Sequence, residues 1–165
     1  DRLRSHDLVE PIRQHARDKH LPTIGICLGS QLLLDTSDEH GMSAGLGLIE
    51  GHVTKLSSGD PDSLVPRLGW AEVEFERSHD YFEPNAETRP FYFAHSHHAR
   101  CMDPRHVIAT TGFGGLRIAA VIGHDNIVGC QFHPEKSQGV GLDLLNYLAK
   151  RTLGHRAPKI VLNAS

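Results

Sequence analysis

Residues 22–34 constrain the fold more than any other part of this 165-residue sequence. They read P-T-I-G-I-C-L-G-S-Q-L-L-L: a short apolar run, a cysteine between two glycines, and then apolar residues at helical spacing. This pattern predicts a buried strand over residues 21–26, a sharp bend at Cys27 and a helix over residues 31–36. Because strand, tight turn and helix form a βα unit, we expect an α/β fold in which helices flank a mainly parallel sheet.

Cys27 stands at the bend, where its side chain is expected to be exposed. A cysteine at a helix N-terminus feels the positive end of the helix dipole, which favours the thiolate. We expect Gly25 and Gly29 to be required, because a Cβ on either side of a strained turn would clash. Cys27 is therefore a candidate nucleophile, and the alternative is a buried structural thiol at the end of a core strand.

The remaining sequence predicts a mixed sheet within a single domain, residues 1–165. Residues 1–20 have the pattern of an amphipathic helix interrupted near Pro11. After a glycine-rich turn over residues 45–51, strands are expected over residues 52–56 (at an edge or antiparallel), 65–75 and 91–96. We expect an antiparallel meander over residues 107–111, 118–122 and 127–132, then a helix over residues 139–153 and a frayed tail over residues 156–165.

Composition argues against several classes of function. A formal charge of -3 gives no indication of a nucleic-acid partner or an anionic membrane surface. No apolar run approaches the roughly 20 residues that span a bilayer. Three cysteines without a C-x-x-C pair argue against a disulfide framework or a zinc site and fit the reducing cytoplasm. The tract H-S-H-H at residues 95–98 has no carboxylate or cysteine at ligand spacing, so we expect no metal and no cofactor.

A histidine and a glutamate follow the last predicted strand, in the sequence G-C-Q-F-H-P-E-K-S at residues 129–137. The proline between His133 and Glu135 restricts the backbone, so the imidazole and the carboxylate can be held in register. A nucleophilic cysteine needs a base, and the base needs a third group to orient it. Cys27, His133 and Glu135 supply these three chemical types. Cys101 and Cys130 lack such a setting and are interpreted as structural.

These motifs resemble a known family. G-I-C-L-G-S-Q together with Q-F-H-P-E is similar to the class I (triad) glutamine amidotransferases. Within that family, G-L-G-L-I, G-W, Y-F-A-H-S and H-P-E-K-S-Q resemble the glutaminase subunit of imidazole glycerol phosphate synthase, an enzyme of histidine biosynthesis. The resemblance runs from the first helix to about Lys150 and implies a flavodoxin-like mixed sheet with an antiparallel portion.

The resemblance also implies roles for individual residues. Cys27 would attack the side-chain amide of L-glutamine, His133 would move the proton, and Glu135 would orient the His133 ring. The Leu28 backbone N–H would donate to the oxyanion. The residues implied to hold glutamine are Leu28, Gln31, Gly47, His95, Ser96 and His97.

The family resemblance implies a partner as well. Ammonia would pass to a TIM-barrel synthase subunit in a heterodimer, across an interface near Trp70, Tyr92 and Lys136. There it would be joined to a phosphoribulosyl intermediate, giving imidazole glycerol phosphate and an aminoimidazole carboxamide ribotide. The alternative for Trp70, from the residue type alone, is a place in the core.

Departures from the family pattern leave alternatives open. Ser30 stands where a larger apolar residue is usual, and Ala71 stands where asparagine is common. The alternatives are a paralogue that feeds a sugar amidotransferase in surface-polysaccharide synthesis, a catalytically impaired docking subunit, and a γ-glutamyl peptidase. The family usually begins with further strands, including one that ends in a P-G-x-G turn and supplies a second oxyanion donor. We therefore expect this chain to be N-terminally shortened, to fold poorly alone and to have little glutaminase activity.

Overall fold

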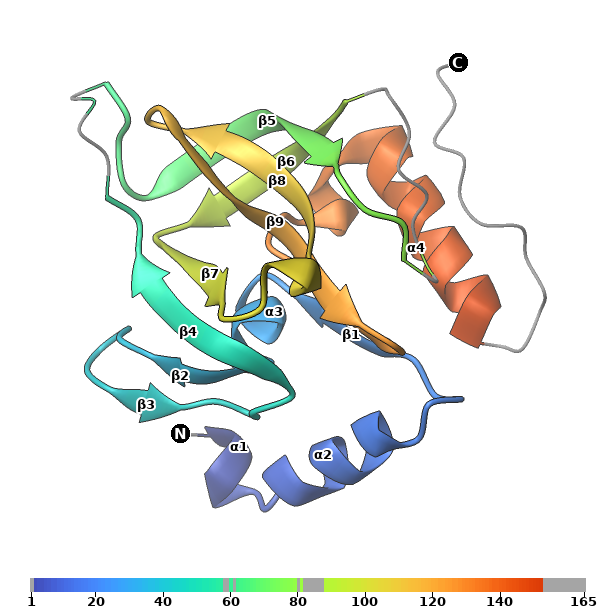
Figure 1. Cartoon of the computed structure of the whole chain (residues 1–165). Helices are drawn as coiled ribbons and strands as arrows, with labels where there is room; N and C mark the ends of the chain where they lie inside the picture. The colour runs from blue at the N-terminus through green and yellow to red at the C-terminus, as the bar shows by residue number, and fades with distance from the viewer. Residues whose placement is uncertain (1, 58–59, 61, 80, 82–87, 153–165) are drawn as a thin grey trace.

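The computed structural model describes residues 2–57, 60, 62–79, 81 and 88–152 (Figure 1). The helices are α1 (Arg2–Ser5), α2 (Val9–Arg17), α3 (Leu28–Leu32) and α4 (Gln138–Thr152), with short 3-10 turns η1 (Pro104–His106) and η2 (Pro134–Lys136). The strands are β1 (Thr23–Ile26), β2 (Leu34–Ser37), β3 (Ser43–Ala44), β4 (Ile49–Lys55), β5 (Arg67–Phe75), β6 (Arg89–His95), β7 (His97–Cys101), β8 (Val107–Phe113), β9 (Leu116–His124) and β10 (Ile127–Cys130).

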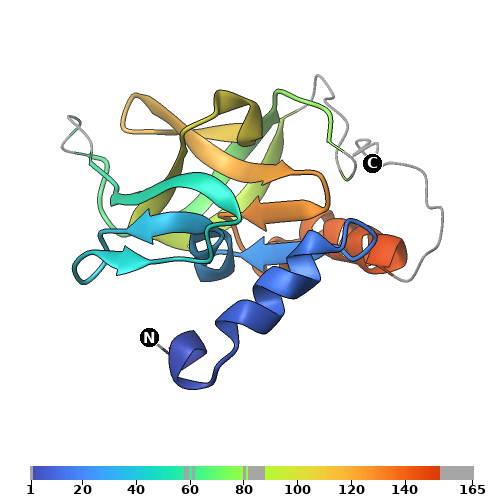
Figure 2. The ribbon, with the colours of Figure 1, turned by 60° about the horizontal axis from the view of Figure 1, so that its bottom comes forward.

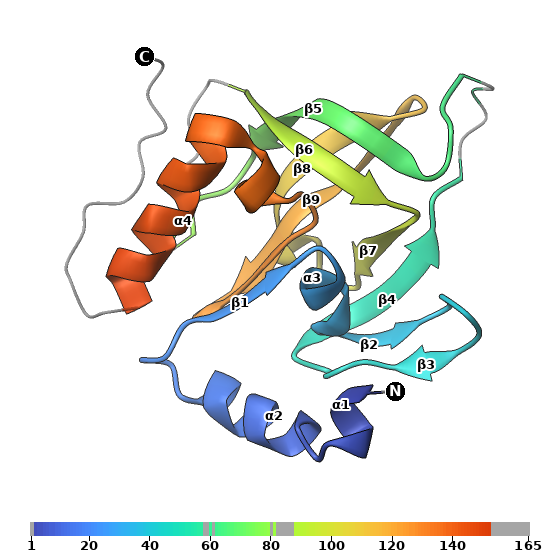
Figure 3. The same cartoon turned by 180° about the vertical axis from the view of Figure 1, so that it is seen from behind.

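These strands form two sheets with α3 between them. The larger sheet has the order β1-β10-β9-β8-β5-β6 and the smaller has the order β3-β2-β4-β7. Helix α3 contacts β1 and β10 of the first sheet and β2 and β7 of the second, and it occupies the centre of the view from behind (Figure 3). The predicted mixed α/β class is confirmed.

The antiparallel portion is larger than expected. Among the described strands, β1 pairs with β10 and β2 with β4 in parallel. The other six ladders are antiparallel. The predicted meander is confirmed as β8-β9-β10. Short connections join the antiparallel pairs β2–β3, β8–β9 and β9–β10, whereas a parallel pair needs a long crossover.

Two apolar cores fix the sheets in place. One lies between the larger sheet and α4, where Phe91 stacks on Phe132 with ring centroids 4.0 Å apart and Leu144 of α4 is fully buried (Figure 3). The other includes Leu34 and Val53 of the smaller sheet and Ala16 of α2, a helix that lies at the bottom of Figure 1 and comes to the front in Figure 2. The predicted C-terminal helix is confirmed to Thr152; Leu153 and the predicted tail over residues 156–165 lie outside the described residues.

The predicted helix over residues 31–36 is wrong. Helix α3 begins at Leu28 and ends at Leu32, and the chain then enters strand β2 at Leu34. Leu34 pairs with Ile49 of β4, a residue distant in sequence. The leucine run at residues 32–34 suits a buried helix or a buried strand equally, and tertiary pairing decided the outcome.

Two other expectations need correction. Pro11 does not interrupt a helix: it lies in the first turn of α2, where a proline leaves no intrahelical hydrogen bond unmade. The break comes earlier, at Asp7, where φ is 54°. Strand β4, expected at an edge or antiparallel, is antiparallel to β7, but it is not at an edge, because β2 pairs with its other side. Pro90 lies within β6, which is the edge strand of the larger sheet as described, the position where a proline is tolerated.

Candidate active site

The bend after β1 gives Cys27 a strained backbone with φ 49°. The Cys27 N–H donates to the Cys130 carbonyl at 2.8 Å, which holds the bend against β10. A Cβ on Gly25 would lie 2.5 Å from the backbone carbon and oxygen of Gly29, so a side chain cannot fit there. A Cβ on Gly29 would meet nothing within 4 Å. The expected clash is therefore confirmed at Gly25 and wrong at Gly29.

Burial outweighs the helix terminus in setting the state of the thiol. Desolvation is the largest influence on Cys27 and raises its pKa, while the backbone N–H of Leu28 lowers it to a lesser extent. The backbone at the helix N-terminus thus favours the thiolate as expected, but its influence is smaller than that of burial, since α3 has only five residues and the thiol is half-buried. Burial also raises the pKa of Cys101 to about 11 and that of Cys130 to about 12, in keeping with their interpretation as structural. Cys27 needs a base.

The base and its orienting group leave the sheet beside Cys27. Ile26 pairs with Cys130 in the parallel β1–β10 ladder, so the segments that follow both strands emerge at the same edge. His133 lies three residues after Cys130, and its Nδ1 is 2.7 Å from Oε1 of Glu135. The Tyr92 carbonyl accepts from the His133 N–H at 2.8 Å and positions the residue. Nδ1 is thus engaged and Nε2 is left for a proton transfer.

The Cys27 thiol has weak partners of its own. Sγ is 3.8 Å from the Ala94 carbonyl and 3.9 Å from Nε2 of Gln131. It forms no hydrogen bond with His133, both residues being among those described. Glu135 nevertheless contributes to raising the Cys27 pKa, which means that the carboxylate lies within electrostatic range of the thiol. The structure thus pairs His133 with Glu135 and brings both near Cys27, but the thiol and the imidazole form no hydrogen bond with each other. Catalytic hydrogen bonds often form fully only when substrate binds.

A cavity of about 330 Å³ opens above Cys27. Its walls include five of the six residues implied to hold glutamine, namely Leu28, Gln31, His95, Ser96 and His97. Gln31 is fixed by hydrogen bonds from its Nε2 to the His97 carbonyl at 2.8 Å and to Oε1 of Gln131 at 3.1 Å. Burial lowers the pKa of His95 to about 4, so this ring is neutral near pH 7.

Gly47 does not line this cavity. It lies on the connection into β4 with φ +59°, where an added Cβ would meet the side chains of Asp35 and Arg13. The tight-turn alternative therefore describes Gly47 better than a ligand loop.

The cavity contains one carboxylate that the sequence did not single out. Glu39 lines it, and Oε1 of Glu39 is 3.6 Å from Nδ1 of His97. Asp38 lies 3.6 Å from the other ring nitrogen of His97. The only signal in the sequence was an acidic pair, Asp38 and Glu39, soon after the helix that follows Cys27. Pro66, Leu68 and Ala94 complete the wall.

The three residues implied to face a partner gather beside His133. Trp70 and Tyr92 are register partners on β5 and β6, and their rings meet edge to face with centroids 6.0 Å apart. Trp70 is 47% exposed, so it is not a core residue. Lys136 is exposed on η2, the turn that begins directly after His133.

Ser30 has a local explanation. It is 2% exposed, and its Oγ would lie 2.5 Å from a Cβ added to Gly129. Gly129 thus leaves room for the buried Ser30 side chain at the contact between α3 and β10, which gives Ser30 a place in the packing. Among the described residues, no three histidine, cysteine or acidic side chains are grouped as metal ligands, and no helix is long and apolar enough to cross a membrane.

Comparison with known proteins decides the family. The profile of glutamine amidotransferase class-I matches residues 4–146, which is most of the chain. The chain belongs to the class-I glutamine amidotransferase family. The family predicted from the cysteine and histidine motifs is thus confirmed, and solved glutamine amidotransferases share its fold. One of them, described as glutamine amidotransferase, has a TM-score of 0.62 at 17% identity over 89% of this chain and 71% of its own.

Curated relatives narrow the assignment within the glutamine amidotransferases. The imidazole glycerol phosphate synthase subunit HisH of Salinibacter ruber is 40% identical over 90% of this chain and 69% of its own length. HisH of Sulfurimonas denitrificans is 40% identical over 91% of this chain and 72% of its own length, and HisH of Zymomonas mobilis is 42% identical over 85% and 64%. This amidotransferase therefore spans roughly two thirds of the length of these relatives, and the predicted assignment to the glutaminase subunit agrees with them.

Proposed function

We propose that the protein is the glutaminase subunit of imidazole glycerol phosphate synthase, working in the cytoplasm with a TIM-barrel cyclase subunit. The observation that carries the proposal is the common edge of β1 and β10, from which the segments that carry Cys27 and the His133–Glu135 pair both emerge, with a cavity beside Cys27. The HisH relatives support the same activity.

Glutamine would bind in the cavity above Cys27. The volume of about 330 Å³ lies within the range of small-molecule sites. The Glu39 carboxylate offers a partner for the α-ammonium group of the substrate. Gln31, held rigidly by two hydrogen bonds, supports the wall beside the thiol.

The chemistry follows from the raised pKa of Cys27. The thiol is protonated near pH 7, so Nε2 of His133 takes its proton as Sγ attacks the amide carbon. The Leu28 N–H would stabilise the oxyanion of the tetrahedral intermediate. Its collapse breaks the C–N bond, and His133 returns the proton to the leaving ammonia. Water then attacks the thioester, with His133 as base, and releases glutamate and the free thiol.

Ammonia would leave toward the surface formed by Trp70, Tyr92 and Lys136. Tyr92 links this surface to the catalytic edge, because its carbonyl accepts from the His133 N–H. Exposed aromatic residues such as Trp70, here packed against the half-buried Tyr92, are enriched in protein interfaces.

The test measures glutamate release by the whole protein with and without a HisF-type cyclase subunit and a cyclase ligand. We expect stimulation by the cyclase, and its loss when Trp70→Ala weakens the complex. Arg105→Ala, which removes an exposed side chain elsewhere, serves as the control. Equal stimulation by a sugar amidotransferase would contradict the cyclase assignment, and glutamine hydrolysis that persists in Cys27→Ala would contradict the mechanism.

A further inference from the structure

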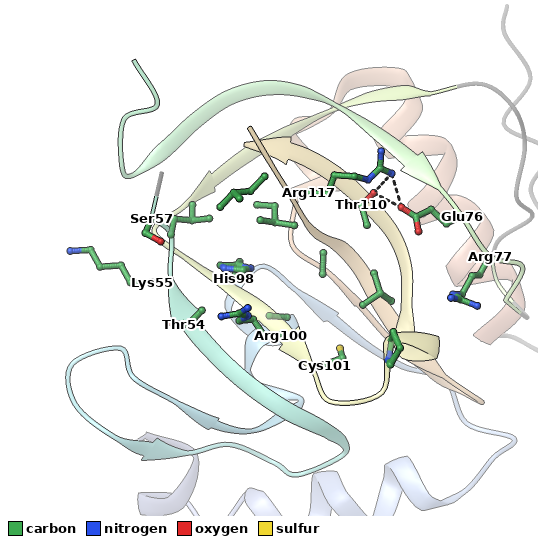
Figure 4. Close-up of a pocket in the computed structure, with 17 residues that line it drawn as sticks. Thr54, Lys55, Ser57, Glu76, Arg77, His98, Arg100, Cys101, Thr110 and Arg117 are labelled. Atoms are coloured by element: carbon green, nitrogen blue, oxygen red, sulfur yellow. Dashed lines mark hydrogen bonds and ion pairs between the residues drawn. The ribbon is translucent and has the colours of Figure 1, made fainter. Parts of the chain in front are cut away.

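A second and larger cavity lies away from Cys27. It has a volume of about 510 Å³ and is bounded by the end of β4, strand β7 and the β8–β9 hairpin (Figure 4). None of its lining residues belongs to the glutamine cavity. The two cavities are nevertheless neighbours, because His97 lines one and His98, the next residue of β7, lines the other. We call the larger cavity the basic groove.

The groove carries a local excess of positive charge. Its charged side chains are Lys55, Arg77, Arg100 and Arg117, with Glu76 as the one carboxylate among its lining residues. Glu76 is already engaged, because its Oε1 accepts from Arg117 and from Thr110, each at 2.6 Å. Within the described part of the chain, Lys55, Arg77 and Arg100 form no ion pair. This excess stands out in a protein whose formal charge is -3.

The polar groups are arranged along the groove. His98 and Arg100 lie side by side on β7 in its middle, while Lys55 extends from one end and Arg77 from the other (Figure 4). His98 is half-buried, and its Nδ1 is buried without a hydrogen-bond partner. Burial, and to a lesser extent the charge of Arg100, lower the pKa of His98, so the ring is neutral near pH 7 and can donate from one nitrogen.

The groove also has apolar walls. Leu56 and Ile118 are buried along it, and Leu116 at the tip of the hairpin is 50% exposed. Cations with apolar contact surface beside them suit a ligand that has an anionic group and a ring. A guanidinium binds a phosphate through two parallel hydrogen bonds, which makes arginine well suited to this anion.

We propose that the basic groove binds a phosphorylated small molecule of nucleotide size, with a phosphate at Arg100 and His98 and a ring against Leu116. The volume fits such a ligand, since sites of about 300–1,000 Å³ hold molecules of this class. The site is separate from the proposed glutamine site and does not depend on it.

The test is a calorimetric titration of the whole protein with ADP, adenosine and inorganic pyrophosphate. We expect ADP to bind with a Kd below about 1 mM and more tightly than either adenosine or pyrophosphate. Arg100→Gln should weaken ADP binding at least about tenfold. Arg105→Gln is the matched control, because Arg105 is an exposed arginine outside the groove, paired with Asp103 at 2.7 Å, and its loss should leave ADP binding unchanged.

Several outcomes would overturn the proposal. They are no ADP binding, adenosine or pyrophosphate binding as tightly as ADP, equal losses in the two arginine variants, or a single-stranded RNA that binds more tightly than ADP. A second variant, Leu116→Ser, keeps the test decisive if Arg100→Gln fails to fold: it should weaken ADP but not pyrophosphate.

Discussion

The glutamine cavity and the basic groove share strand β7 but have opposite chemistry. The glutamine cavity holds a thiol, one carboxylate and neutral or carboxylate-flanked imidazoles. The groove holds four cations, of which Arg117 is paired with the carboxylates of Glu74 and Glu76. Successive side chains of a strand face opposite ways, so His97 and His98 serve different cavities although they are adjacent in sequence. A histidine-rich tract is therefore better understood residue by residue than as one site.

The largest expected effect is on glutamine hydrolysis, which depends on the glutamine cavity and not on the basic groove. Cys27→Ala should lower the rate of glutamine hydrolysis by at least about 10⁴-fold, because nothing else in the cavity can form the thioester. The same variant should bind ADP in the basic groove as the parent does. Glutamate release and calorimetry provide the two measurements. A hydrolysis rate within tenfold of that of the parent protein would show that Cys27 is not the nucleophile.

The second effect is a dependence of the free energy of unfolding on pH, which we expect to come chiefly from His95. Burial lowers the pKa of His95 from its usual 6.5 to about 4 in the folded protein, so between these pH values the unfolded chain binds a proton that the native chain does not. The stabilisation that results is fully present above pH 6.5 and is lost as the pH falls toward 4. Its loss lowers the free energy of unfolding by up to about 3 kcal/mol.

Urea denaturation between pH 7 and pH 4 would measure this decline. His95→Gln should flatten the curve in that window. His98→Gln in the basic groove should flatten it less, because the His98 pKa is lowered to a smaller extent. An unchanged slope in His95→Gln would mean that the ring is protonated in the native protein.

The third effect tests how the bend positions Cys27. Gly25→Ala should reduce the free energy of unfolding by about 1–3 kcal/mol, because its Cβ would overlap the backbone of Gly29. Gly29→Ala is the matched control inside α3, where open space and the helix preference of alanine predict a gain of about 0.5–1 kcal/mol. Chemical denaturation at pH 7 measures both. Similar losses in the two variants would contradict the open space at Gly29.

The smallest effect tests Glu39. Glu39→Gln should raise the KM for glutamine about tenfold and change kcat little, since the proposed contact is with the α-ammonium and not with the reacting amide. Glu72→Gln, an exposed position on β5, is the control. Steady-state kinetics measures KM and kcat separately. A fall in kcat at constant KM would assign Glu39 to the chemistry instead.

Local patterns explain which parts of the fold could be predicted. The β8-β9-β10 meander and α4 were predictable because their turn signals and apolar periods lie within the segments themselves. The change from α3 to β2 was not, because the leucines at residues 32–34 suit either element and their pairing partner, Ile49, lies far along the chain. For the same reason the sequence did not indicate that Glu39 lines the cavity and Gly47 does not: both lie on connections beside the paired strands β2 and β4.

The sequence by itself determined the family and the chemical types at the catalytic edge. A cysteine in a strand–turn motif and a His-Pro-Glu motif are local signals, and the profile match over residues 4–146 confirmed the family that they indicated. Tertiary structure alone decided the protonation of Cys27, because desolvation depends on which segments cover the thiol. It also created the basic groove, since Lys55, Arg77, Arg100 and Arg117 come from four separate segments that carry no shared motif. Burial and long-range pairing are properties of the folded chain, which is why neither could be derived from residue order.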